Sequence, residues 1–246
     1  MINLFRSLAA LLFTVAVFDS LALAHTPVDF LEVVEVEPAR TITHAVELKS
    51  RFDRKKVETE LEGPRYFSRS VECLNRPVKN PLAYLTWFEL VAPAVEPVRE
   101  IDVLDMIRGG SNKSLRIKSA EFLLTPAQLI TTGAPESVPD GLDHYKAYRI
   151  VDAPSLDQEV TLTDISGPRK RRLGKPLFVC LPVREWHHDE FFAASHPNDC
   201  FVVYQLDERS HDATFSTLDQ FGLNELRAQA RRWLCVRAAL LTGTGG

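Results

Sequence analysis

The sequence predicts an all-β protein built from tandem pseudo-repeats of about 55 residues. Three observations support this prediction. Short segments alternate polar and apolar residues, as half-buried strands do. Similar segments return at one spacing along the chain. Turn-forming residues separate them, including 15 prolines and 11 glycines. The arrangement of the repeats stays open between a barrel, a sandwich and a small propeller.

The first 24 residues have the three parts of a secretory signal. Arg6 supplies a positive charge, residues 8–18 are an apolar run of 11 residues, and Ala22-Leu23-Ala24 is a cleavage pattern. The run is shorter than a membrane span of about 20 residues. We expect an N-terminal signal helix at 1–24, cleavage before His25, and a secreted or periplasmic product without a transmembrane anchor. The alternative is a buried N-terminal helix.

Self-comparison of the sequence defines the repeats. The alternating segment AYLTWFEL begins at residue 83, and similar segments begin at 143 and 199, at spacings of 60 and 56 residues. Two further blocks recur at the same period, the first around Asp105, Asp164 and Asp219, the second around Leu124, Cys180 and Cys235. The predicted division is a degenerate first repeat at 25–79, a second at 80–138, a third at 139–194, a fourth at 195–241 and a disordered tail at 242–246.

The segment 223–241 is ambiguous between strand and helix. Its Leu, Ala and Arg content favours a helix, and its apolar spacing also suits a helical stripe. The equivalent stretch of the third repeat contains Pro176 and Pro182, which do not fit a helix interior. We therefore predict two strands for 223–241.

The blocks DHYKAY at 143–148, LDQFG at 218–222 and PLFVCLPV at 176–183 resemble a secreted bacterial domain of unknown function. Its repeats run roughly D-H-F-x-C-Y, D-Q-F-G and L-C-x-P-V. The resemblance covers about residues 80–240 and departs at Ala147 and Val203, where that pattern has cysteine. It implies a repeat architecture and brings no activity and no catalytic residues.

The chain has four cysteines, an even number that allows two disulfides in an oxidising compartment. Cys180 and Cys200 are 20 residues apart and flank the junction between the third and fourth repeats, which makes them the easiest pair to join. Cys73 and Cys235 would then connect the first repeat to the last. The alternative is four buried free thiols.

A basic run in the third repeat is the main candidate binding surface. It consists of Arg169, Lys170, Arg171, Arg172 and Lys175, and Arg231 and Arg232 occupy related positions in the fourth repeat. Such a cluster attracts anionic polymers, and binding of that kind weakens with salt. The alternative is a solvated hairpin whose charges block edge pairing. The net charge of −4 argues against a surface built for nucleic acid, so none is expected as a partner.

Catalytic patterns are absent from the sequence: it has no G-x-S-x-G elbow, Walker loop or H-E-x-x-H helix. The segment 186–190 (WHHDE) carries metal-ligand types, yet adjacent residues of a strand face opposite sides. The recurring aspartates suit turn caps better than calcium ligands.

The sequence thus favours an exported, non-catalytic repeat module that acts by binding or as a structural part of the cell exterior. No cofactor is expected, and its partner would be an anionic polymer or another exported protein. The alternative is a secreted hydrolase or lyase with a site between repeats, with or without a metal. That site would require His144, His188, Asp189 and His211 to converge.

Overall fold

A computed structural model of the chain describes residues 28–93, 95–107, 112–131, 137–139 and 141–243. Every regular element in these ranges is a β-strand, so the all-β prediction is confirmed. The signal helix predicted at 1–24 lies outside the described residues. The strands are β1 (Phe30–Pro38), β2 (Ile42–Lys49), β3 (Val57–Ser70), β4 (Glu72–Cys73), β5 (Tyr84–Val91), β6 (Arg99–Asp105), β7 (Asn112–Ile130), β8 (Tyr145–Val151), β9 (Gln158–Asp164), β10 (Gly167–Pro182), β11 (Arg184–His187), β12 (Glu190–Phe192), β13 (Asp199–Asp219) and β14 (Gly222–Gly243).

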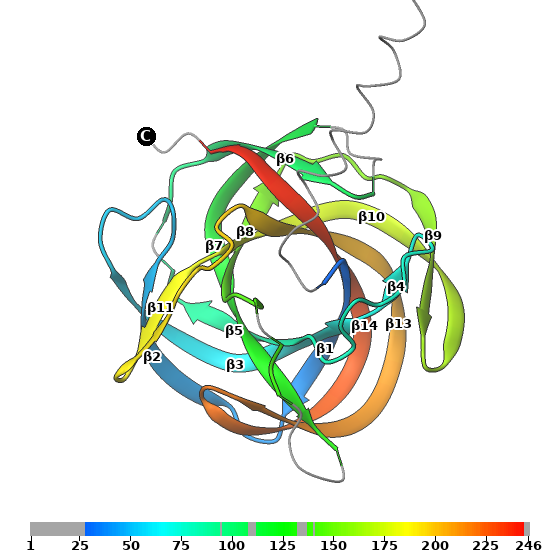
Figure 1. Cartoon of the computed structure of the whole chain (residues 1–246), viewed down its shortest axis with the longest axis horizontal. Helices are drawn as coiled ribbons and strands as arrows, with labels where there is room; N and C mark the ends of the chain where they lie inside the picture. Colours follow the sequence, from blue (N-terminus) through cyan, green and yellow to red (C-terminus); the bar gives the residue numbers. More distant parts are fainter. Residues whose placement is uncertain (1–27, 94, 108–111, 132–136, 140, 244–246) are drawn as a thin grey trace, which may run out of the picture.

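All described strands belong to one sheet, and eight of them close into a ring. Each pairs antiparallel with the next in the order β1, β3, β5, β7, β8, β10, β13 and β14, and β14 then pairs with β1. Figure 1 shows this ring end-on, with the remaining strands around its outside. Propeller blades are separate sheets, so one continuous sheet does not fit the propeller alternative.

The repeat appears in the structure as one strand order that occurs four times. A strand enters the ring, the chain forms a hairpin outside it, and the second arm of that hairpin runs on as the next ring strand. The hairpins are β2–β3, β6–β7, β9–β10 and the outer halves of β13 and β14. In the fourth unit the ring strand and the first hairpin arm are one strand, β13. The boundaries assigned to the repeats stay predictions.

The interior of the ring is filled by large side chains that alternate along its strands. The buried cluster includes Trp87, Phe122, Phe178 and Trp233. The ring centroids of Trp87 and Trp233 are 5.8 Å apart, and those of Phe178 and Trp233 are 5.4 Å apart. Eight strands enclose a space just wide enough for side chains to fill, so this interior is a packed core.

The four hairpins lie over the outer face of the ring. Successive residues of a ring strand face the interior and the outer face in turn, and apolar side chains occur on both. A second cluster joins residues of ring strands, such as Phe88 and Val202, to hairpin residues such as Leu48, Val103 and Leu162. A smaller third cluster around Phe67 and Leu226 lies under the fourth hairpin. Residues from both faces of the ring strands are therefore buried, and each hairpin depends on the ring for its own burial.

The recurring aspartates cap hairpin turns, as the sequence suggested. A carboxylate oxygen of Asp105, Asp164 or Asp219 accepts a hydrogen bond from the backbone N–H two residues later, at 3.1, 2.8 and 2.9 Å respectively. The third and fourth hairpins then continue with Gly167 and Gly222, whose φ angles of 97° and 117° favour glycine. The D-x-x-G pattern is therefore turn chemistry.

The segment 223–241 is β-structure, so the preference for strand over helix is confirmed. It is one long strand, β14, rather than the two strands expected from the repeat. Irregular register between Gln205 and Arg209 and between Ser210 and Ala213 bends the β13–β14 ladder between ring and hairpin. Thr242 and Gly243, the first two residues of the predicted tail, pair with β6, and the rest of that tail lies outside the described residues.

Both predicted disulfides are absent, and the four cysteines are buried free thiols. Cys180 is opposite Phe201 in the β10–β13 ladder, so both side chains lie on one face of the sheet. Cys200 directly precedes Phe201 and therefore faces the other side. Cys180 and Cys235 belong to the interior cluster, whereas Cys73 and Cys200 belong to the outer one. The sheet therefore lies between the two cysteines of each predicted pair, and the positions of the cysteines in the sequence cannot reveal this.

This arrangement predicts the thiol chemistry of the protein. Protein unfolded in denaturant without a reductant should release four reactive thiols per chain. The native protein should react much more slowly, because burial raises the pKa of these thiols and shields them. Titration with a chromogenic disulfide measures both. Fewer than four thiols in the unfolded, unreduced chain would contradict the structure.

Candidate functional site

Three of the seven predicted binding cations point inward and surround one buried carboxylate. Glu32 of β1 is fully buried. Its Oε2 atom lies 3.0 Å from Arg231 Nη1 and 3.3 Å from Arg169 Nη2, and its Oε1 atom lies 3.3 Å from Arg171 Nη1. A fourth guanidinium, that of Arg69, is 3.7 Å away. The alternation of β10 turns Arg169 and Arg171 towards the ring.

A second carboxylate extends this cluster into the third hairpin turn. Asp164 Oδ2 lies 2.6 Å from Arg69, 2.9 Å from Arg169 and 3.2 Å from Arg231. Burial opposes ionisation of Asp164, but the hydrogen bonds from Ser166 and Arg169 and the nearby guanidinium charges keep its pKa below the usual value. These ion pairs connect β1, β3 and β14 of the ring to the β9–β10 hairpin. The arginines are cross-links within the fold.

The other four predicted cations face solvent to different extents. Lys170 and Arg172 are 75% and 71% exposed and form surface ion pairs with Glu159 at 2.9 Å and Asp157 at 3.2 Å. Lys175 is exposed. Arg232 is one-third exposed and pairs with Glu35 and Glu208 at 2.5 and 3.0 Å. The run of basic residues is thus divided by strand alternation into a buried set and an exposed set.

A separate polar cluster forms where the turn of the fourth hairpin meets β8 and β11. His144 Nε2 donates to the amide oxygen of Gln220 at 2.8 Å, and the Gln220 amide nitrogen donates to Glu185 Oε1. Glu185 is fully buried, and its Oε2 atom has no hydrogen-bond partner among the described residues. Gln220 therefore connects two titratable groups from segments far apart in the sequence.

Burial shifts these groups in opposite directions. It raises the pKa of Glu185 to about 8 and lowers the pKa of His144 to about 4, so both are held in their neutral forms near pH 7. Burial also raises the pKa of Asp219, in the same turn, to about 6. Paired groups with separated pKa values are typical of functional sites, although structural clusters show them too.

A hollow of about 400 Å³ adjoins this cluster. His144, Asp219 and Gln220 line it together with Glu190 and apolar side chains that include Phe192, Leu142 and Leu218. The rings of His144 and Phe192 pack at 4.6 Å. Polar groups at one edge of an apolar hollow are the usual composition of a small-ligand site.

The residues required for an enzyme with a site between repeats do not converge. His144 lies in the cluster above, His188 and Asp189 lie on the exposed β11–β12 turn, and His211 lies in β13 near Arg231. His188 packs instead on His187, with ring centroids 4.1 Å apart. Across the described residues, no group of three or more His, Cys, Asp or Glu side chains could hold a metal ion.

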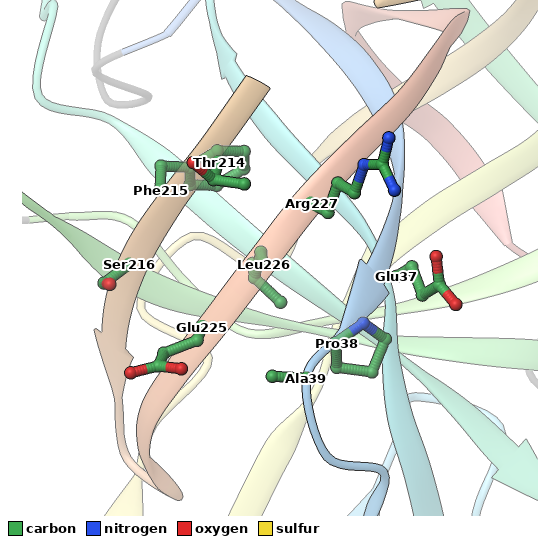
Figure 2. Close-up of a pocket in the computed structure, with 9 residues that line it drawn as sticks. All are labelled: Glu37, Pro38, Ala39, Thr214, Phe215, Ser216, Glu225, Leu226 and Arg227. Carbon is green, nitrogen blue, oxygen red and sulfur yellow. The ribbon is translucent and has the colours of Figure 1, made fainter. Parts of the chain in front are cut away.

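Another hollow of about 520 Å³ lies beside the fourth hairpin and is open to solvent. Figure 2 shows Leu226 at its centre, with Glu37, Glu225 and Arg227 around it on β1 and β14. Arg227 is already paired with Asp212 at 3.0 Å. The charge of Glu37 also acts on Arg227.

Sequence reasoning singled out His144 and the turn block that contains Gln220, but it did not join them. Glu185 was missed altogether. It directly precedes the 186–190 segment, and no spacing distinguishes it from an exposed glutamate. Only the approach of the fourth hairpin to β8 and β11 makes it a site residue, and that contact depends on ring closure.

The fold and these clusters define an all-β repeat protein whose polar side chains mainly connect its units. Residues 84–237 match the family described as a repeat of unknown function (DUF7450). The match spans more than half of the chain, and the chain belongs to this family. Searches of the curated proteins and of the solved structures gave no match. None of the described segments forms a helix long and apolar enough to cross a membrane.

The Glu32 cluster predicts a large stability effect from a small substitution. Glu32→Gln removes one buried charge and leaves Arg169, Arg171 and Arg231 without their shared partner, which should cost about 3–5 kcal/mol. The matched control is Glu208→Gln, which removes an exposed partner of Arg232 and should cost less than about 1 kcal/mol. Urea denaturation measures both. Equal stabilities of the two variants would contradict a structural role for Glu32.

The raised pKa of Glu185 predicts how stability depends on pH. The folded state holds the proton up to about pH 8, whereas the unfolded chain releases it near 4.5, so this group's contribution to stability falls as pH rises between these values. The lowered pKa of His144 changes the stability only below its unfolded value of 6.5, and the raised pKa of Asp219 changes the stability only below about 6. Between pH 6.5 and 8, Glu185 therefore acts alone within this cluster.

Over that window the free energy of unfolding should fall by up to about 2 kcal/mol more in the wild type than in Glu185→Gln. Urea denaturation at pH 6.5 and at pH 8 measures the difference. Glu58→Gln, at an exposed position of β3, is the control and should follow the wild type. Parallel pH profiles for the wild type and Glu185→Gln would show that Glu185 ionises normally.

Proposed function

We propose that this protein is an exported, non-catalytic repeat module that acts outside the cell by binding a partner. Export is inferred from the signal pattern at residues 1–24, which lie outside the described residues. The observation that supports the non-catalytic role is that the recurring polar residues serve to stabilise the fold. Asp105, Asp164 and Asp219 cap turns, and the central arginines neutralise Glu32.

A hydrolase or lyase role finds less support. His188, Asp189 and His211 lie away from His144, and the Nε2 atom of His144 is engaged with Gln220. In the described part of the chain, no serine, threonine or cysteine hydrogen-bonds a histidine in the way an activated nucleophile does. The Cys200 thiol donates to a backbone carbonyl instead.

The partner that the surface charges favour is an anionic polymer, and the outer face of the third hairpin is the proposed contact. Lys170, Arg172 and Lys175 are the exposed cations of the basic run. The ion pairs of Lys170 and Arg172 lie at the surface, where such pairs contribute little, so a polymer with closely spaced charges can replace Glu159 and Asp157. Arg169, Arg171 and Arg231, which pair with Glu32, hold the hairpin in place.

Binding of heparin, a sulfated polysaccharide, at two salt concentrations tests this proposal. Lys170→Ser combined with Arg172→Ser and Lys175→Ser should weaken binding by roughly tenfold or more at low salt and reduce its salt dependence. The control combines Arg40→Ser, Arg54→Ser and Lys55→Ser, which removes the same charge at other exposed positions. Unchanged binding in the hairpin variant, or equal loss in both variants, would refute this contact surface.

A further inference from the structure

The hollow beside Gln220 differs from the arginine clusters in how its acidic groups are compensated. Glu32 and Asp164 each contact several arginines, and Asp29 contacts Lys79 and Arg237. The buried Asp105 and Asp143 accept hydrogen bonds from Tyr204 and from backbone N–H groups. Within the described residues, neither Asp219 nor Glu190 has a salt bridge to lysine or arginine, and Glu185 approaches only the neutral His144. This corner of the fold lacks positive charge.

The hydrogen-bonding groups of the hollow are mainly acceptors. His144 donates through Nε2 to Gln220, so the Nδ1 atom of its neutral ring carries a lone pair. The His144 side chain lines the hollow and is only 7% exposed. The carboxylate of Glu190 adds a further acceptor. Asp219 adds a second carboxylate, whose oxygens also accept hydrogen bonds from the Phe221 N–H and the Asn224 amide. A complementary ligand therefore brings N–H donors and positive charge.

The remaining walls of the hollow are apolar and specify the body of such a ligand. Phe192, Leu142, Leu218 and Pro126 line it, and its volume of about 400 Å³ lies within the usual range for small-molecule sites. The half-buried ring of Phe192 offers a face to which a cation is attracted. An inorganic cation would leave these apolar walls unused, and a carboxylate or phosphate would face Asp219 and Glu190.

We propose that this hollow is a binding site for a small organic cation, a primary amine on an apolar body, held by Asp219, Glu190 and His144. The ammonium donates to the carboxylates and to the Nδ1 atom of His144, and the apolar body packs against Phe192 and the leucines. The site lies between the fourth hairpin turn and the strands β8 and β12. It is separate from the proposed polymer contact on the third hairpin.

Benzylamine is a suitable probe, and benzyl alcohol is its uncharged analogue of nearly equal shape. Calorimetric titration of the full chain at pH 7.5 should give saturable benzylamine binding at least tenfold tighter than that of benzyl alcohol. In ¹⁵N NMR spectra, the Nδ1 signal of His144 should shift during the amine titration, as it does when an imidazole nitrogen accepts a hydrogen bond. Equal affinity for the two compounds, or no binding at millimolar amine, would overturn the proposal.

Two substitutions locate the site. Asp219→Asn keeps an oxygen that can cap the turn but removes the charge, and it should weaken benzylamine binding by tenfold or more. Glu190→Gln changes an exposed residue outside the core, so it folds independently of any defect in the Asp219 variant, and it should weaken binding by severalfold. Glu225→Gln, in the hollow of Figure 2, is the control. Wild-type affinity in both hollow variants would overturn the assignment.

Discussion

The pairing of β1 with β14 is the constraint on which the rest of the structure depends. It joins the first described strand to the last and closes the ring between the first and fourth repeats. Leu31 and Val33 then face the packed interior, while Glu32 between them faces the outer layer. An open sheet would expose both faces of these strands to water and leave the hairpins without a curved surface to cover.

Ring closure also determines how the protein holds its buried charges. At the β1–β14 junction, Glu32 and Asp164 are compensated by arginines from three parts of the chain, a geometry in which removal of one partner is costly. Near the fourth hairpin turn, Glu185 and Asp219 have no such cations. Glu185 is held protonated near pH 7 and accepts a hydrogen bond from Gln220, and Asp219 accepts hydrogen bonds from the Phe221 N–H and the Asn224 amide. The first arrangement stabilises the fold, and the second is the basis of the proposed amine site.

The sequence predicted the repeated strands and turns but not the closure of the sheet into a ring. Period-two alternation, the turn-forming residues and the 55-residue spacing indicated strands, turns and a repeated unit, because these features are visible in short segments of the sequence. Whether Arg171 is buried and Arg172 exposed depends on which face of β10 meets the ring, and one residue of register reverses the result. The same step of one residue places Cys180 and Cys200 on opposite faces. Glu185 acquires its environment only from contacts between distant segments.

The central claim is that β1 is an integral part of a closed ring, and amide hydrogen exchange tests it most directly. The amides of residues 31–34 in β1 and 231–236 in β14 should exchange as slowly as those of β8 and β10, through global unfolding alone. This result would show that the first and last strands share the stability of the whole. Rapid exchange in β1 with continued protection of β8 and β10 would show that the ring is open, and the account would be wrong.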